Sequence, residues 1–388
     1  EWHFIVGTFG GKTLRMYVDG QRQGQAQSAG QVDMNPNDWP IMVGAESSSN
    51  GGQQFLGSID EVAMYSRELS ADEVLDIFRS GMAMPDLATK PQPQNGAVDV
   101  PRDATLGWTP GGLAASHDVY LGTTLASVTD ASRDNPMGVL VGREQGDTAY
   151  DPDGLLEYGQ TYYWRIDEVN GAPDFTIFQG DVWSFTVEPY AYPITSLTVT
   201  ASSQQTTSPA VRTIDGSGLD EFDQHSVNLR DMWVAPSGLP AWIQYEFDRE
   251  YKLHELWVWN SNSELEAVMG FGARDVAVEY SADGSAWTQL ENVPEFTQGP
   301  GVATYATNIV IDLNGVRAQY VRLTINSSWG NSPMVGLSEV RFYYVPVQAF
   351  GPEPADGATS VSIDATLNWR PGREATSHTV YLGTDANA

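Results

Sequence analysis

Cysteine is absent from the 388 residues, and lysine occurs only at positions 12, 90 and 252. Without cysteine the chain has no disulfide, no thiolate nucleophile and no cysteine-bound metal. The sequence also lacks an apolar run of about 18 residues, which excludes a membrane-inserted helix. Basic side chains are scarce as well, with 20 against 50 acidic ones and a net charge of −30. Nucleic acid and anionic membrane surfaces are therefore poor partners, because both require a basic surface.

The acidic excess leaves two interpretations open. It can serve solubility alone, because a large net charge keeps chains apart. It can also belong to sites for calcium, which prefers carboxylate and carbonyl oxygens. Neutral polymers and divalent cations thus remain as possible partners.

Glycine and proline are plentiful, with 38 and 22 residues spread along the chain. They separate short runs in which apolar and polar residues alternate, which is typical of β-strands joined by turns. The chain is long enough for two to four domains at roughly 150 residues per domain. We expect an all-β chain of tandem β-sandwich modules, with one short helix near 71–79.

An internal repeat divides the chain. Residues 91–123 and 352–384 align without gaps and are identical at 20 of 33 positions. The second copy stops soon after its YLGT motif, so 347–388 is expected to be a truncated version of 84–189. Residues 1–83 and 190–346 form two further units. The chain starts at Glu1 without a signal peptide, and we expect both ends to be cuts in a longer protein.

In residues 1–83, two alternating runs precede a turn at Asp19-Gly20, and strands are expected near 40–44 and 59–65. The sequence Ser70-Ala71-Asp72-Glu73 is a capping box that begins the helix. The motifs YVDG, FLGSIDEVAMY and LSADE resemble the C-terminal half of laminin-G-like, concanavalin-type jelly rolls. That resemblance implies binding of glycans or proteins, with Asp60 and Glu61 as either cation ligands or structural carboxylates.

Residues 84–189 contain short strands around Trp108, 117–121, 162–166 and 182–187. Strands of this length between proline and glycine turns favour a sandwich. The pattern resembles fibronectin type III-like domains, which implies a spacer. His117 recurs as His378, and a structural role in the repeat is the preferred interpretation over catalysis, since no serine motif or partner carboxylate recurs with it.

Residues 190–346 contain at least five alternating strands, near 242–248, 253–259, 276–281, 320–325 and 337–342. The motifs Ile214-Asp215-Gly216, WIQYEF, VEYSADGSAW, QYVRLTI and LSEVRFY resemble the discoidin, or coagulation factor V/VIII C-type, domain. This galactose-binding-like sandwich includes the family 32 carbohydrate-binding modules of bacteria. The resemblance implies a module of a large, secreted bacterial protein that binds carbohydrate.

The same resemblance implies a structural calcium ion beneath the binding loops. Its ligands would be Asp215 and Glu339, with further oxygens from Thr213, Ser217, Asp220 and Ser226. Calcium takes six to eight hard oxygens and tolerates irregular loops. The alternative is that Asp215 is only a turn residue.

A sugar site needs an aromatic face and a few planar hydrogen-bonding groups. Most tryptophans of 190–346 are expected in the core: Trp233, Trp242 and Trp287 by their positions, and Trp257 and Trp259 because they share a strand face. The candidate ligand-binding residues therefore lie in loops, or near them, and are Asn260, Asn262, Arg274, Asn326, Trp329 and His225. The alternative is that these Asn- and Ser-rich loops only make turns.

No serine-hydrolase, zinc-protease, P-loop or dinucleotide motif occurs in the sequence, so we expect no catalytic residues. The preferred interpretation is an extracellular, secreted or cell-surface region that binds a polysaccharide or glycoconjugate. One alternative is a set of accessory modules of a larger polysaccharide-degrading enzyme. Another is a surface scaffold whose partners are surface proteins.

Overall fold

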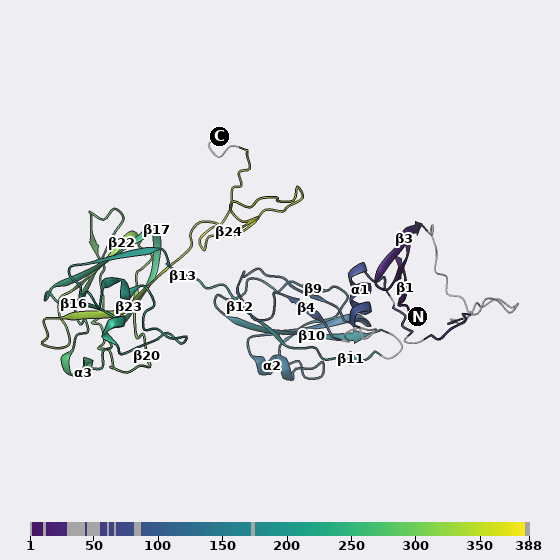
Figure 1. Ribbon diagram of the computed structural model, residues 1–388, viewed down its shortest axis with the longest axis horizontal. Coiled ribbons are helices and arrows are strands. Elements are labelled where there is room, and N and C mark those ends of the chain that lie inside the picture. Colours follow the sequence, from purple (N-terminus) through teal and green to yellow (C-terminus); the bar gives the residue numbers. More distant parts are fainter. Residues whose placement is uncertain are drawn as a thin grey trace. The chain divides into compact units, whose positions relative to one another are not determined.

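The computed structural model describes residues 2–10, 13–28, 43–44, 55–59, 62–65, 67–80, 87–171 and 175–384. It divides into two compact units, Glu1–Glu188 and Pro189–Ala388, whose ribbons are shown in Figure 1. Both units are built almost entirely from β-strands, as the alternating sequence predicts. None of the helices in the described part of the chain is long and apolar enough to cross a membrane.

The N-terminal segment is an antiparallel sheet with one helix. Its strands are β1 (Ile5–Gly10), β2 (Thr13–Val18) and β3 (Gln21–Ser28), and its helix is α1 (Ala71–Ser80). The predicted capping box is confirmed, because the Ser70 amide donates to Glu73 Oε2 (2.7 Å) and the Glu73 amide donates to Ser70 Oγ (3.2 Å). The described residues of 59–65 form no strand. Asp60, Glu61 and residues 40–42 lie outside the described residues.

Residues 87–188 form a module of two sheets (Figure 1). The larger sheet has the order β5-β12-β10-β7-β8, with β11 beside β10, and the smaller has the order β4-β6-β9. Its strands are β4 (Thr89–Gln92), β5 (Ala97–Val100), β6 (Leu106–Thr109), β7 (Ala114–Gly122), β8 (Leu140–Gln145), β9 (Ala149–Tyr150), β10 (Thr161–Asn170), β11 (Ile177–Phe178) and β12 (Trp183–Val187).

The core of this module lies between the two sheets. Trp108 from the smaller sheet meets Trp164 from the larger sheet with ring centroids 6.5 Å apart, and Leu106 and Ile166 are fully buried beside them. A short helix that the sequence analysis did not predict, α2 (Leu125–Asp130), covers the opposite face of the larger sheet. The assignment of this sandwich to the fibronectin type III family stays a prediction.

On that opposite face, the buried guanidinium of Arg165 holds the end of α2. Its N–H groups donate to the carbonyls of Val128, Thr129 and Ala131 at 2.7–2.9 Å and to both carboxylate oxygens of Asp167. Cationic donors suit a helix C-terminus, where the last carbonyls lack partners within the helix. Arg165 therefore links the helix to the sheet.

Residues 190–346 form a second sandwich. One sheet has the order β14-β17-β22-β18-β19, and in the other β17 pairs with β21 and β23, and β23 pairs with β13 and β16. The strands are β13 (Tyr192–Pro193), β14 (Leu197–Ala201), β15 (Gln224–His225), β16 (Trp233–Ala235), β17 (Ala241–Asn260), β18 (Val276–Ser281), β19 (Thr288–Gln289), β20 (Tyr305–Ala306), β21 (Ile309–Asp312), β22 (Arg317–Ile325) and β23 (Val335–Tyr344).

Strand β17 joins these two sheets. Its first half pairs with β14 and β22, its second half pairs with β21 and β23, and a register shift between Glu246 and Tyr251 marks the crossing. The sequence pattern predicts two strands here, whereas the structure has one continuous strand. The inner faces of both sheets meet at Phe342, whose ring lies 5.0 Å from Tyr245 and 5.1 Å from Phe247.

The tryptophans of this module divide between core and surface. Trp233 and Trp259 are fully buried, as expected. The prediction for Trp242 is wrong, because it lies in the outward phase of β17 and is 36% exposed. Trp287 and Trp257 are half-buried. On the outer face of the sheet, Arg322 stacks between Trp242 and Trp287, with its guanidinium carbon 5.6 and 3.9 Å from their ring centroids.

Several short elements complete the second unit. Helix α3 (Glu266–Met269) and the 3₁₀ turns at Ala210–Thr213 and Leu229–Asp231 lie in connections between strands. Strands β24 (Phe350–Glu353) and β25 (Asn368–Arg370) form a separate hairpin-like pair in the C-terminal repeat. Residues 376–383 of that repeat are in no strand.

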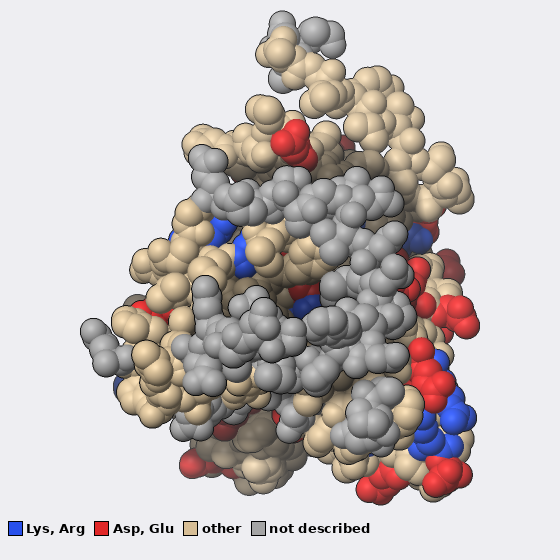
Figure 2. Space-filling model, turned by 90° about the vertical axis from the view of Figure 1, so that its right-hand side faces the viewer, with Lys and Arg blue, Asp and Glu red and all other residues tan. Residues whose placement is uncertain are grey.

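Charged residues are spread over the surface. On the face of the molecule drawn in Figure 2, acidic side chains lie at several separate places, and basic side chains lie singly or beside them. The described residues on that face therefore form no broad basic area.

Candidate functional site

Two connections at one end of the second sandwich run side by side and present polar and aromatic groups. We call this surface the rim patch, defined as Arg274, Asp275, Glu295, Asn326 and Trp329. The Arg274 amide donates to the Ser327 carbonyl (2.9 Å), and the Asn326 amide donates to the Asp275 carbonyl (2.8 Å). These bonds extend the pairing of β18 with β22 past the strand ends. They bring Arg274, Asn326 and Trp329, which were predicted from the sequence, to one place.

The Trp329 side chain is fixed within this patch. Its indole N–H donates to the Phe296 carbonyl (2.9 Å), and its amide donates to the Gly272 carbonyl (3.1 Å). The next residue, Gly330, packs so closely on the end of α3 that a Cβ atom there would lie 1.9 Å from the Met269 carbonyl oxygen. Only glycine fits at this contact, so the backbone holds the indole in a defined position.

The ring remains accessible and carries a cation beside it. Trp329 is 38% exposed, and the Arg274 guanidinium carbon lies 4.9 Å from its ring centroid. Arg274 also forms an exposed ion pair with Glu295 (3.2 Å). Asp275 and Asn326 are exposed next to them. An aromatic face with planar amide, carboxylate and guanidinium groups around it can stack on a sugar ring and bond its hydroxyls.

Asn260 and Asn262 do not belong to this surface, which corrects the sequence-based expectation. Both are fully buried. The Asn260 amide nitrogen donates to the carbonyls of Ala273 and Thr297, and its oxygen accepts from the amides of Ser261 and Ala273. Asn262 binds the loops in the same way, through the carbonyls of His225, Ser226 and Val302 and the amide of Gly301. These two side chains hold loops together and have no polar atom free for a ligand.

His225 is also buried instead of facing a ligand. Its Nδ1 lies 2.9 Å from the Ser226 carbonyl, and its ring touches the backbone at Gly218, where a Cβ would lie 2.8 Å from Cε1. Burial lowers the pKa of His225, which favours the neutral ring. The expectation that His225 contributes to sugar binding therefore conflicts with its position inside the loop.

Glu339 lies near Asp215, the first residue of the segment from Asp215 to Asp231, which we call the acidic loop. Glu339 is buried on β23, and its Oε2 has no hydrogen-bond partner within the described structure. Burial raises the pKa of Glu339 to about 8, and the negative charges of Asp215 and Asp223 add to this effect against the opposing charge of Arg341. A buried carboxylate oxygen without a partner fits a cation. A bound cation would give the oxygen a partner and would neutralise the buried negative charge, both of which are otherwise unfavourable.

The other predicted metal ligands are occupied by the loop itself. Asp220 Oδ1 accepts from the amides of Phe222 and Gln224, and Ser226 Oγ donates to Asp231. Ser217 Oγ accepts from Arg212, which also bonds Asp215 at 3.0 Å. Within the described residues, no three His, Asp or Glu side chains are grouped closely enough to hold a metal ion. A cation at Glu339 would thus need main-chain oxygens and displacement of Arg212 from Asp215.

Several residues that order these loops were not identified from the sequence. Arg341 donates to both carboxylate oxygens of Asp223 (2.7 and 2.9 Å) and ties the acidic loop to β23. Glu266 is fully buried and accepts from the Gly272 amide (2.8 Å), and burial raises its pKa. The alternation in VRFYY places Arg341 on the outward side of the strand, where it can reach a loop. No local pattern in the sequence marks Glu266.

The first module contains a buried histidine–carboxylate pair. His117 Nδ1 contacts Glu168 Oε2, the Glu168 Oε1 accepts from the Gly111 amide (2.9 Å), and the His117 ring meets the edge of Trp108. The partner carboxylate, Glu168, lies outside the repeated residues 91–123 and therefore does not recur with His378. Both side chains are shielded from solvent within the sandwich. The structural role preferred from the sequence suits this position.

Two family models match the chain. Residues 198–340 match the F5/8 type C domain, and residues 1–75 match the Concanavalin A-like lectin/glucanases superfamily. The chain thus contains an F5/8 type C (discoidin) domain and a laminin G/concanavalin-like domain. No curated protein matches the chain.

Similar solved structures include several modules from Clostridium perfringens. CBM32-3 of a family 31 glycoside hydrolase is 19% identical, with 40% of this chain and 95% of that chain covered and a TM-score of 0.31. The family 32 module of NanJ in complex with galactose is 16% identical, with 40% and 98% covered and a TM-score of 0.29. CpGH89, in complex with GlcNAc-α-1,4-galactose, is 19% identical with a TM-score of 0.29. The match covers 39% of this chain and only 14% of CpGH89.

Proposed function

We propose, taking residues 198–340 as an F5/8 type C domain, that this chain is a non-catalytic glycan-binding region whose rim patch contacts the sugar. The observation that carries the proposal is the fixed and exposed indole of Trp329, with Arg274 stacked beside it. The lectin-type family match of residues 1–75 supports the same class of ligand. The proposed setting is extracellular, on a secreted or cell-surface protein.

The open geometry favours binding over catalysis. The rim patch is exposed, and its charges are in contact with solvent. Catalytic groups instead sit in shielded clefts that shift their pKa values. The buried carboxylates Glu266 and Glu339 are not part of the rim patch, because both lie beneath the loops. Glu266 accepts a hydrogen bond from the Gly272 amide there.

Replacing Trp329 by alanine is expected to weaken glycan binding at least tenfold. Loss of a stacked aromatic ring removes about 1.5 kcal/mol, and about 1.4 kcal/mol corresponds to a factor of ten in affinity. Glycan-array screening of the full chain identifies the ligand, and calorimetric titration then compares the variants. Trp242→Ala is a matched control, because Trp242 is nearly as exposed (36% against 38%) but lies on the sheet face.

The two tryptophans make the outcome informative. Unchanged affinity in Trp242→Ala with a loss in Trp329→Ala places the sugar on the rim patch. The reverse result would move the binding surface to the outer face of the sheet and refute the rim patch. If no glycan bound the full chain, the proposed function itself would be refuted.

We further propose that Glu339 binds a structural calcium ion together with Asp215 and main-chain oxygens of the acidic loop. The support is the unpartnered, buried Oε2 of Glu339 and its raised pKa. The ion would neutralise both carboxylates and order the loop between Asp215 and Asp231. Calcium would then stabilise this module by mass action, by about 2.7 kcal/mol at a hundredfold excess over the dissociation constant.

The calcium proposal is tested by Glu339→Gln. Calcium is expected to raise the melting temperature of the wild-type module in scanning calorimetry, and the variant is expected to lose this response. With chelator present, the variant should be at least as stable as the wild type near neutral pH, because it no longer buries a carboxylate. Asp220→Asn is a control that should keep the response. A full calcium response in Glu339→Gln would contradict the assignment.

A further inference from the structure

The segment that follows β17 contains three buried side-chain oxygens without hydrogen bonds. Glu266 Oε2, Ser261 Oγ and Ser263 Oγ have no hydrogen-bond partner in the described part of the chain, and their residues are at most 1% exposed. Such atoms are rare in native proteins, because a buried polar atom without a partner costs free energy. Three of them between residues 261 and 266 are suited to bind an ion together.

The sequence of this segment would allow two of these side chains to bond each other. The pattern S-E-L-E at 263–266 has the spacing of the capping box at 70–73, in which both reciprocal side-chain bonds form. At 263–266 only the main-chain bond is present, from the Glu266 amide to the Ser263 carbonyl (2.8 Å). The Glu266 carboxylate turns instead to Gly272, whose amide donates to Oε1 (2.8 Å). The other oxygen, Oε2, and Ser263 Oγ thus stay available to a ligand.

The groups with the largest influence on the Glu266 carboxyl are uncharged. Burial raises the pKa of Glu266, while the Gly272 amide and the side chains of Ser261 and Gln298 lower it. The Ser261 hydroxyl therefore lies beside the carboxyl, yet it forms no hydrogen bond with it in the described structure. Two oxygens that lie near each other without a hydrogen bond are arranged as the ligands of one cation are.

We propose that Glu266 Oε2 and the hydroxyl oxygens of Ser261 and Ser263 form a site for a monovalent alkali cation, separate from the calcium site proposed at Glu339. Carboxylate and hydroxyl groups are hard oxygen ligands, which suit hard cations. One carboxylate supplies one negative charge, so a monovalent cation makes the site neutral. A divalent cation would leave a buried positive charge without a partner.

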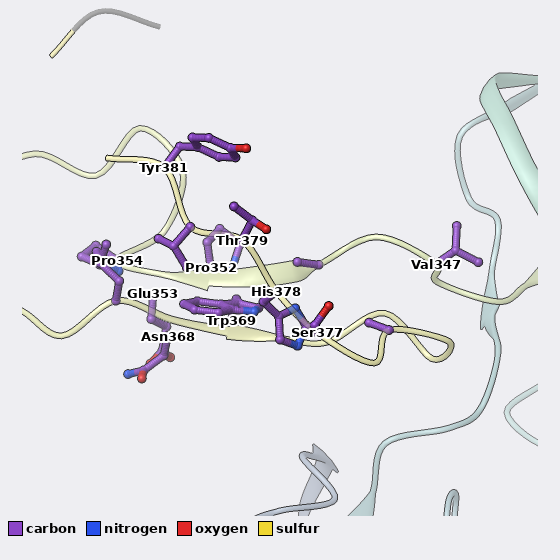
Figure 3. A pocket seen from close by; sticks show the side chains of 14 residues that line it. Val347, Pro352, Glu353, Pro354, Asn368, Trp369, Ser377, His378, Thr379 and Tyr381 are labelled. Carbon is purple, nitrogen blue, oxygen red and sulfur yellow. The ribbon is translucent and has the colours of Figure 1, made fainter. Parts of the chain in front are cut away.

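A groove in the C-terminal repeat offers a contrast. It has a volume of about 490 Å³, and Figure 3 shows Trp369 and His378 next to each other in its lining. Among the described residues that line it, only Glu353 carries a carboxylate, and this residue is exposed. An exposed carboxylate gains little from a cation, because water already solvates it. The oxygens around Glu266 gain more, because they are removed from water.

The proposed cation site is connected to the rim patch through the main chain. Glu266 holds the Gly272 amide, and the Gly272 carbonyl accepts from the Trp329 amide (3.1 Å). Met269, in the same helical turn as Glu266, packs against Gly330. A cation at Glu266 would therefore steady the backbone that carries the indole. This consequence for glycan affinity rests on the proposed function, whereas the cation site itself does not.

The test is the thermal response of the full chain to alkali cations, measured by scanning calorimetry with a chelator present. Sodium or potassium chloride, in place of an equal concentration of tetramethylammonium chloride, should raise the melting temperature of the second sandwich. The expected rise is about 2–4 °C at about a fivefold excess over the dissociation constant. Equal ionic strength keeps the screening of the net charge constant.

Glu266→Gln should abolish this response. In tetramethylammonium chloride the variant should be at least as stable as the wild type, because it no longer buries a carboxylate. Glu264→Gln is the matched control, since it removes the same charge from an exposed position two residues away and should keep the response. Glu339→Gln should keep it as well, which separates this site from the calcium site. Crystals grown with rubidium should show an anomalous peak beside Glu266 Oε2.

Three outcomes would overturn the inference. One is an equal response of Glu266→Gln and the wild type, or no difference between the alkali salts and tetramethylammonium chloride. A second is stabilisation of the wild type by acid alone, equal in all salts, which would assign a proton to Glu266. The third is a calcium response that Glu266→Gln loses and Glu339→Gln keeps, which would assign a divalent ion. None of these measurements involves a glycan, so the proposed function is tested separately.

Discussion

Replacing Trp233 by alanine is expected to lower the free energy of unfolding of the second sandwich by about 3–5 kcal/mol, the cost typical of removing a buried aromatic ring. Trp233 is completely buried between the sheets, and its indole N–H donates to the Ser203 carbonyl (3.0 Å). The variant loses this packing and leaves the carbonyl without a donor. Trp242→Ala should cost about 1 kcal/mol or less, because exposed substitutions are nearly neutral apart from the lost contact with Arg322.

Native-state hydrogen exchange measures this difference separately for each module of the chain. The slowest amides of β17 and β23 report the global stability of residues 190–346, and those of β7 and β10 serve as an internal reference. A similar cost for both substitutions would contradict the placement of Trp242 on the surface. So would a large decrease for Trp242→Ala alone.

Arg165→Met is expected to destabilise the first module by about 3–5 kcal/mol, the range for breaking a buried ion pair from one side. All five guanidinium N–H groups are used in this structure, two by Asp167 and three by carbonyls at the end of α2. The variant leaves Asp167 with a buried charge and only the Gly180 amide as a donor. Arg317→Met removes an exposed ion pair with Glu250 and should change stability by about 0.5 kcal/mol or less.

The cost of Arg165→Met should depend on pH. Burial already raises the pKa of Asp167, and loss of the guanidinium, which lowers it, raises the pKa further. A carboxyl with a raised pKa in the folded state holds its proton more tightly there than in the unfolded chain. Its contribution to stability is therefore largest below about pH 3.9, the pKa of an unfolded Asp, and is lost as the pH rises through the pKa of the folded state. Exchange measurements should thus find the smallest deficit near pH 4 and the largest near neutral pH. A constant deficit would contradict this account.

The strands of the second sandwich were largely predictable from the sequence. Alternation in residues 276–281, 320–325 and 337–342 corresponds to β18, β22 and β23, because the inward phase must be apolar to fill the core. What the pattern did not predict is the continuity of β17. A strand that crosses between sheets changes its partners without a turn residue, so its two halves look like two strands.

The same alternation contained the correct position of Trp242. In Ala241–Phe247, residues 241, 243, 245 and 247 are buried, and Trp242 belongs to the other phase. The core prediction for Trp242 rested on its position in the motif, which conflicts here with the phase of the strand. Trp287 follows β18 in a turn, and the cation that half-covers it, Arg322, comes from a different strand.

The loops were harder to predict because their contacts are distant in sequence. A run of Asn and Ser indicates a turn, and Trp329 and Asn326 do lie in an exposed turn. Asn260 and Asn262 have a similar local pattern, yet they bond backbone groups 13 to 40 residues away. Only the packed fold brings those groups together. The calcium site proposed at Glu339 would need main-chain oxygens as ligands, and these leave no mark in the sequence.

The pairing of β13 with β23 determines how the second sandwich would respond to tension along the chain. Tyr192 lies opposite Tyr344, so the chain enters and leaves the sandwich on adjacent strands at the same end. A pulling force on both flanks acts first on this short clamp, whose hydrogen bonds would open one after another. The remaining strands and the loops above them carry no load until the clamp has opened. The sandwich can therefore stay folded while the flanking chain is stretched by a small force.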